Sequence, residues 1–192
     1  MTAAGLILAG GEGRRWGGPK AWARLPDGRT FLEACARSLE EGGAAPVAAT
    51  LPPGAGGPVP AGVVAVPLPA PGLDMMASVR HGLGWLLERV GWERVILLPV
   101  DHPLVAPSTV AALAAAEAAA AIATWNGRHG HPLALSREVA ERVADGRSPG
   151  PTLREVLREA GAVDVAVDDP GIRANCNTPE ALREALERLA TG

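Results

Sequence analysis

The sequence predicts a single α/β domain over residues 1–192, built as a three-layer sandwich around a mostly parallel sheet. Short apolar runs with β-strand character alternate with helical patterns along the chain, which is typical of βα units with helices on both faces of a sheet. The length and the 47% apolar composition are enough to bury one full core.

Six strands are expected from the apolar runs between turn residues. They lie at Ala4–Ala9, Val47–Leu51, Val63–Pro67, Arg94–Val100, Ala121–Trp125 and Val163–Val167. The continuous run at Arg94–Val100 is the clearest central strand, because a strand buried on both faces shows no polar alternation.

Helix starts are marked by their caps. Thr30–Glu33 and Thr152–Glu155 have the spacing of capping boxes, and Thr178 is followed by a proline at the first helical position. The last helix, Pro179–Leu189, has one apolar face, so we expect it to pack on the sheet.

Composition and charge favour a cytoplasmic protein that binds small molecules. The net charge of −3 is spread over interspersed Glu and Arg, which does not suit nucleic-acid or membrane binding. Cys35 and Cys176 lie far apart, as expected of a reducing compartment. Met1–Gly11 lacks the features of a signal peptide, and the apolar run Val110–Ala123 is too short to span a membrane.

A glycine-rich segment follows the first strand and ends at Lys20. Residues 10–20 contain the glycines Gly10, Gly11, Gly13, Gly17 and Gly18 and the cations Arg14, Arg15 and Lys20. Glycines let successive backbone N–H groups approach an anion, so the segment outlines a triphosphate cradle. The alternative is a flexible surface loop with solvated cations. The spacing fits neither a Walker A loop nor the dinucleotide-binding fingerprint.

Lys20 is the only lysine in a chain rich in arginine. If a solvated charge were sufficient here, arginine would serve, so a compact and flexible ammonium group is indicated.

Asp101 follows the central strand, and the glycine-rich segment follows the first strand. Ligands of open parallel sheets bind outside the carboxyl ends of the strands, so both features should face one cleft, where Asp101 can hold Mg²⁺. Near the C-terminus, Asn175 and Asn177 can complete a metal shell or bind substrate, although an Asx turn before the last helix explains them nearly as well.

Other residues give weaker signals. His102, His129 and His131 lack the spacing of a zinc site. Trp16 or Trp22 can stack on a base, although packing in the protein interior is the simpler interpretation.

Residues 8–20, Leu-Ala-Gly-Gly-Glu-Gly-Arg-Arg-Trp-Gly-Gly-Pro-Lys, resemble the signature of the MobA/MocA-like nucleotidyltransferases, with Trp16 where that signature has Met. Further matches in the family's order are Met75–Leu83, Leu97–Leu104, Gly130–Pro132 and Asn175–Glu180. Together the matches span nearly the whole chain.

The resemblance implies a Rossmann-like fold of the nucleotide-diphospho-sugar transferase type. It also implies a Mg²⁺-dependent transfer of a nucleoside monophosphate from an NTP, with GTP favoured over CTP, to molybdopterin or molybdenum cofactor with release of pyrophosphate. It implies transient contact with molybdoenzymes or cofactor-synthesis proteins. Carried over by residue, Arg15, Lys20 and Asp101 are catalytic, Leu8, Ala9, Gly10, Gly11, Gly13, Lys20 and Ser78 bind the nucleotide, and Asp101 binds metal with Asn175 or Asn177.

The resemblance leaves the base and the acceptor open. The Leu-Ala-Gly-Gly and Asn-Cys-Asn-Thr-Pro-Glu segments favour GTP, whereas the segments at Ser78–Leu83 and Gly127–Pro132 look like the cytidylyl branch. A sugar-phosphate-type nucleotidyltransferase and a non-catalytic module that binds nucleotide or cofactor also fit the sequence.

Overall fold

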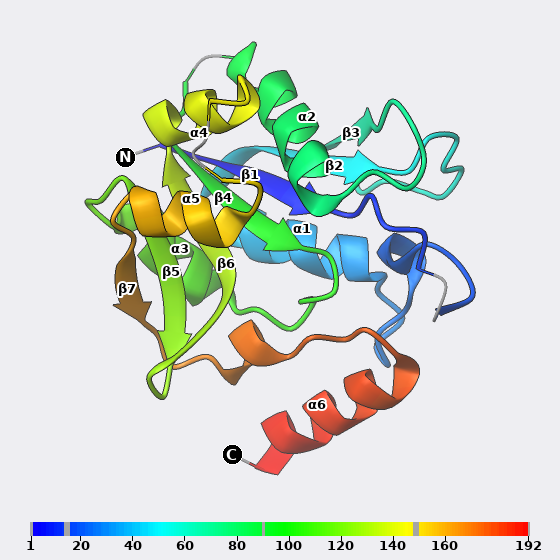
Figure 1. Ribbon diagram of the computed structural model, residues 1–192. Coiled ribbons are helices and arrows are strands. Elements are labelled where there is room, and N and C mark those ends of the chain that lie inside the picture. Colours follow the sequence, from blue (N-terminus) through cyan, green and yellow to red (C-terminus); the bar gives the residue numbers. More distant parts are fainter. Residues whose placement is uncertain (1, 14–15, 90, 148–149, 192) are drawn as a thin grey trace.

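A seven-stranded sheet forms the centre of the computed structural model, which describes residues 2–13, 16–89, 91–147 and 150–191. The strand order is β3-β2-β1-β4-β6-β5-β7 (Figure 1). The strands are β1 (Ala3–Leu8), β2 (Ala44–Leu51), β3 (Val63–Pro67), β4 (Arg94–Pro99), β5 (Ala120–Trp125), β6 (Arg128–Ser136) and β7 (Val163–Ala166). The predicted α/β class and the six predicted strands are confirmed.

The sheet is mostly parallel, as predicted, and β6 is the strand that runs against its neighbours. It pairs antiparallel with both β4 and β5, while the other pairs are parallel. The sequence prediction missed β6. Its first half contains Gly130 and Pro132, which are uncommon inside strands, and its polar residues resemble a loop.

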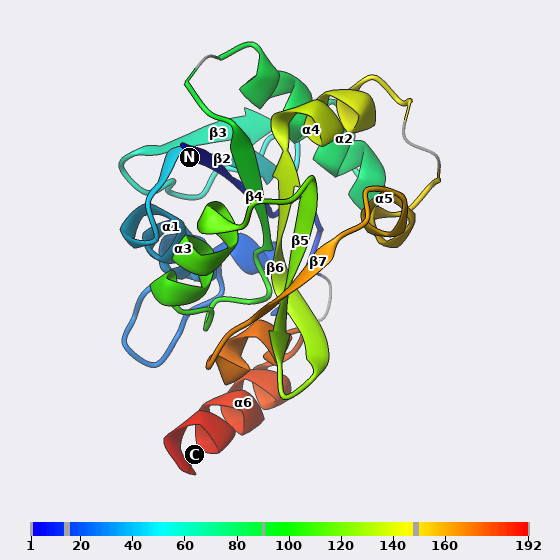
Figure 2. The same cartoon turned by 90° about the vertical axis from the view of Figure 1, so that its left-hand side faces the viewer.

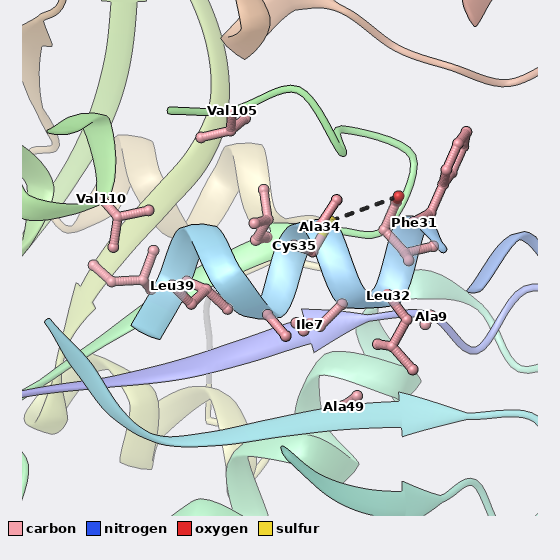
Figure 3. Close-up of a cluster of buried hydrophobic side chains, with 14 of the residues drawn as sticks. Ile7, Ala9, Phe31, Leu32, Ala34, Cys35, Leu39, Ala49, Val105 and Val110 are labelled. Carbon is pink, nitrogen blue, oxygen red and sulfur yellow. Dashed lines mark hydrogen bonds between the residues drawn. The ribbon is translucent and has the colours of Figure 1, made fainter. Parts of the chain in front are cut away.

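Helices cover both faces of the sheet (Figure 2). One face carries α1 (Phe31–Glu41) and α3 (Pro107–Ala115), and the other carries α2 (Met75–Leu87), α4 (Arg137–Ala144) and α5 (Leu153–Glu159). Each face has its own cluster of buried apolar side chains. Figure 3 shows the apolar face of α1 lying over Ile7 of β1 and Ala49 of β2. The result is the predicted three-layer sandwich.

The predicted helix caps are confirmed. Thr30 and Glu33 form a reciprocal capping box on α1, and Thr152 and Glu155 form one on α5. Each box satisfies two backbone N–H groups that would otherwise lack partners at the start of a helix, which fixes where these helices begin.

The last helix, α6 (Pro179–Thr191), does not pack on the sheet, so that prediction is wrong. It extends beyond the lower edge of the sandwich in Figure 1 and contacts the short 3-10 helix η3 (Pro170–Arg173). Its apolar face is narrow, and Leu182 and Ala185 are its buried members, which is enough to anchor one end against η3 but not to cover a strand. Among the described residues, no helix combines the length and the apolar character needed to cross a membrane.

Gly82 lets α2 lie close to the sheet, which places the N-terminal half of this helix beside the end of β1. A Cβ at Gly82 would lie 2.7 Å from Leu6 and 2.9 Å from Thr50. We expect Gly82→Ala to lower the free energy of unfolding by about 1–3 kcal/mol, because neither buried neighbour has room to move. The measurement is urea denaturation.

Gly84 in the same helix provides the matched control. A Cβ there meets nothing within 4 Å, so Gly84→Ala should raise the free energy of unfolding by up to about 1 kcal/mol through helix propensity. Equal effects of the two substitutions would contradict the close approach at Gly82.

Candidate functional site

The candidate site lies where the sheet changes direction of winding. From β1 the chain continues outward to β2 and β3, and from β4 it continues to the other half of the sheet. Leu8 at the end of β1 pairs with Pro99 at the end of β4, so the segments that follow these strands start side by side. This switch point is where open α/β sheets bind their ligands.

Three side chains from distant parts of the chain meet at this switch point. The Lys20 ammonium donates to Asp101 Oδ2 at 3.0 Å and also to Asn177 Oδ1. The Lys20 and Asp101 side chains are about one-fifth exposed, so the ion pair is partly shielded from water yet open to a ligand. The predicted grouping of Lys20 and Asp101 is therefore found, and Asn177 rather than Asn175 completes it.

The oxygens around the Lys20 ammonium suit a hard divalent cation. A carboxylate of Asp101 and a side-chain carbonyl of Asn177 converge on one positive charge, which is the ligand chemistry that Mg²⁺ prefers. The ammonium marks the position where a cation is stabilised. These residues therefore fit a metal ion, provided that Lys20 turns away from the oxygens.

The glycine loop, residues 10–18, folds back on itself between β1 and η2 (Lys20–Trp22). Gly13 has a φ of +61°, and a Cβ on it would lie 1.9 Å from the carbonyl oxygen of Gly18. The backbone N–H of Trp16 donates to the Gly13 carbonyl at 2.8 Å. Only glycine fits at position 13, because a side chain would force the two arms of the loop apart.

The other predicted nucleotide-binding residues lie at the start of this loop. Leu8 and Ala9 are buried, and a Cβ at Gly10 would lie 2.3 Å from Leu68 and 3.3 Å from the Ser78 hydroxyl. Ser78 donates to the Asp74 carbonyl at 3.1 Å, so its hydroxyl is oriented by α2. A further predicted residue, Gly11, has nothing within 4 Å of a Cβ and is open to a ligand.

Arg15, the third predicted catalytic residue, lies outside the described residues, as does Arg14. Both tryptophans considered for base stacking are held by protein groups instead. Trp16 packs edge-on against Phe31, and the Trp22 ring lies over Gly57.

The residues 174–178, here called the asparagine segment, enter the site from the C-terminal side. The Cys176 N–H donates to the Asp101 carbonyl at 2.7 Å, which places Asn177 beside the Asp101 side chain. Burial raises the pKa of Cys176 to about 11, so this thiol is protonated at neutral pH. Asn175 lines a cavity on the other side of Asp101.

This cavity has a volume of about 1030 Å³ and lies over β6, α5 and η3. Its walls combine apolar side chains with polar and cationic ones, among them Met75, His102, His131, Arg154, Arg158, Arg173 and Asn175. The order β1-β4-β6 places the glycine loop to one side of Asp101 and the cavity to the other. The cavity therefore begins next to Asp101, at His102.

Two histidine rings line the cavity next to Asp101. His102 and His131 contact each other edge to face, with ring centroids 4.8 Å apart. Burial, followed by the proximity of His131, lowers the pKa of His102 to about 4, and burial lowers the pKa of His131 as well. Both rings are therefore neutral near pH 7, and they line the cavity without adding charge.

The sequence analysis missed the arginines of the cavity. Arg154 and Arg158 are four residues apart on α5, a spacing that places both on one face of a helix. The capping box at Thr152 located this helix, but the side of the sheet on which α5 lies depends on tertiary packing, and no local pattern contains that information.

Comparison with known proteins places this geometry in a family. The model of the MobA-like NTP transferase domain matches residues 5–165. A molybdenum cofactor guanylyltransferase of Rhodobacter capsulatus is 35% identical over 98% of this chain and 97% of its own length. A protein of the same name from Acidiphilium cryptum is 35% identical over 76% of this chain and 74% of its own length.

Solved structures show the same fold. The crystal structure of an Rv0371c homologue from Mycobacterium sp. strain JC1 superposes with a TM-score of 0.77, at 25% identity, over 98% of this chain and 97% of its own. The 2-C-methyl-D-erythritol 4-phosphate cytidylyltransferase of Thermus thermophilus has a TM-score of 0.67, at 24% identity, with both chains fully covered. The predicted nucleotide-diphospho-sugar transferase type of fold is confirmed.

The neutral state of His102 makes the stability of the protein depend on pH. The unfolded chain takes up a proton at this histidine near pH 6.5, whereas the folded protein does so only at about pH 4. The contribution of His102 to the free energy of unfolding is therefore greatest at high pH. The free energy of unfolding should fall by about 2 kcal/mol between pH 8 and pH 5 as the unfolded chain takes up this proton.

Urea denaturation at several pH values of the wild type and of His102→Gln measures this contribution. The variant should lose about 2 kcal/mol less than the wild type over the same interval. Parallel pH profiles of the two proteins would show that His102 is not held neutral by the fold.

Proposed function

The chain belongs to the family of proteins with the MobA-like NTP transferase domain, and we propose that it transfers a guanylyl group from GTP to molybdopterin or molybdenum cofactor, releasing pyrophosphate. The observation that carries this proposal is the meeting of Lys20, Asp101 and Asn177 between the glycine loop and the cavity. The names of the two 35% identical relatives support the acceptor and the base.

In this proposal the glycine loop holds the triphosphate. The backbone N–H groups of Gly10, Gly11 and Gly13 face the phosphates, and the folded-back shape set by Gly13 forms the concave surface that an anion needs. Lys20 and Arg15 supply positive charge to the phosphates. Ser78, next to Gly10, lies on the nucleoside side of the loop.

Asp101 and Asn177 would hold a Mg²⁺ ion, because their oxygens already converge on the Lys20 ammonium. When bound, the ion would neutralise charge on the α-phosphate and orient it for in-line attack. Lys20 would then be free of its two oxygen partners and able to contact the triphosphate.

The acceptor would lie in the cavity with its phosphate directed at Asp101. Arg154, Arg158 and Arg173 outnumber Asp164 among the charged lining residues, so the walls carry net positive charge, which suits an anionic acceptor. The histidine rings, packed edge to face, add neutral surface. The acceptor phosphate is itself the nucleophile, so the protein needs no side-chain nucleophile. Catalysis then consists of positioning and stabilisation of charge.

The test is pyrophosphate release by the purified protein with molybdopterin or molybdenum cofactor and GTP, CTP, ATP or UTP in separate reactions, each with and without Mg²⁺. We expect release with GTP and Mg²⁺ only. Release with CTP alone would assign the protein to the cytidylyl branch. If none of the four nucleotides reacts but GTP still raises the melting temperature, either the acceptor is another phosphorylated compound or the protein is a binding module.

Replacement of Lys20 tests the assignment of the site. We expect Lys20→Ala to lower kcat/KM by about 10² to 10³, or roughly 2.7–4 kcal/mol, because one charge contact to the transition state is lost. Steady-state kinetics of pyrophosphate release measure the effect.

Arg24→Ala is the matched control, since Arg24 is an exposed cation four residues along the chain that donates to the Gly28 carbonyl. It should keep kcat/KM within about twofold of the wild type, as is usual for a surface substitution away from a site. A loss of less than about fivefold in Lys20→Ala, well short of the expected transition-state contribution, would remove Lys20 from the mechanism.

A further inference from the structure

The indole of Trp16 joins the glycine loop to the asparagine segment. Its Nε1–H donates to the carbonyl oxygen of Cys176 at 3.1 Å. The N–H of the same cysteine donates to the Asp101 carbonyl at 2.7 Å. Cys176 is therefore held from both sides, by the N-terminal loop and by the end of β4, and it stands directly before Asn177.

Trp16 is itself fixed in position. Its ring packs edge to face against Phe31, with centroids 5.3 Å apart and an interplanar angle of 75°. Phe31 is fully buried at the start of α1, and the backbone N–H of Trp16 is bonded to Gly13. The indole is thus a short rigid link, and its geometry follows from the turn at Gly13 and from the packing on α1.

This link differs from the contact that Lys20, just after the glycine loop, makes with the asparagine segment. The Lys20 ammonium also reaches Asn177, but a triphosphate on the glycine loop would compete for that charge. The Trp16 hydrogen bond joins a neutral donor to a backbone carbonyl, and a phosphate does not compete with it for Cys176. Once Lys20 contacts the triphosphate, Trp16 still holds the asparagine segment to the loop.

We propose that Trp16 is a positioning residue that keeps Asn177 beside Asp101 while nucleotide occupies the glycine loop. Its effect on catalysis rests on the proposed function, whereas its hold on the asparagine segment does not. The signature that residues 8–20 resemble has Met at this position, and Met has no side-chain N–H to donate. The link is therefore not part of that signature.

The test compares Trp16→Phe with Trp22→Phe. The first keeps an aromatic ring against Phe31 and removes the indole N–H, while the second removes a similar hydrogen bond, from Trp22 to the Pro58 carbonyl at 2.9 Å, on the exposed side of the molecule. Trp16→Met removes the same N–H and introduces a flexible side chain. It can be compared with Trp22→Phe if Trp16→Phe folds poorly. Urea denaturation verifies folding of each variant.

The first measurement is amide hydrogen exchange of the asparagine segment, which requires no activity. We expect the Cys176 amide, which is bonded to the Asp101 carbonyl, to exchange about three- to tenfold faster in both Trp16 variants, the effect of losing one hydrogen bond, and at the wild-type rate in Trp22→Phe. Unchanged exchange in both Trp16 variants overturns the proposal.

The second measurement is the kinetics of pyrophosphate release. We expect both Trp16 variants to lower kcat about three- to tenfold with a change of less than about twofold in the KM for GTP, because the loop still binds the triphosphate. Faster exchange with an unchanged kcat overturns the positioning role. A wild-type protein without transferase activity would instead contradict the proposed function, and hydrogen exchange would still decide the role of Trp16.

Discussion

The contact of the Lys20 ammonium with the side-chain oxygens of Asp101 and Asn177 is the interaction on which the arrangement of the site depends. Its two partners lie 81 and 157 residues further along the chain. The N-terminal loop, the central strand and the C-terminal segment must all be in place before it can form. The parallel pairing of β1 with β4 positions the N-terminal loop and the central strand, because it brings the ends of both strands to one edge of the sheet.

The third part is the asparagine segment, and the turn that leads into it is held in place by the buried carboxylate of Asp169. Asp169 accepts hydrogen bonds from the Ala106 N–H, the Thr109 hydroxyl and the Gly171 N–H, so it ties η3 to the start of α3. A Cβ at Gly171 would lie 2.1 Å from the Leu104 carbonyl, which shows how closely η3 lies against this loop. The η3 turn that leads into the segment is therefore held by the loop before α3.

Much of this could be predicted from the sequence where a local pattern carries the information. The apolar runs located six strands, and the rule that ligands bind at strand ends correctly brought Lys20 and Asp101 together at one edge of the sheet. The choice of Asn177 over Asn175 depends on the hydrogen bond of Cys176 to Asp101, which joins distant segments. The strand β6 was missed because its glycine and its proline carry turn signals that tertiary pairing with β4 overrides.

The charges of the free site explain why a cation is expected with the nucleotide. The positive charge of Lys20 is balanced by Asp101, and His102 and His131 are neutral near pH 7. A triphosphate would draw the ammonium toward itself and leave the Asp101 carboxylate facing phosphate oxygens, which is unfavourable in a partly buried site. A divalent ion on Asp101 removes this repulsion. Under the proposed function, Lys20 could therefore contact the phosphates only if another cation took its place beside Asp101.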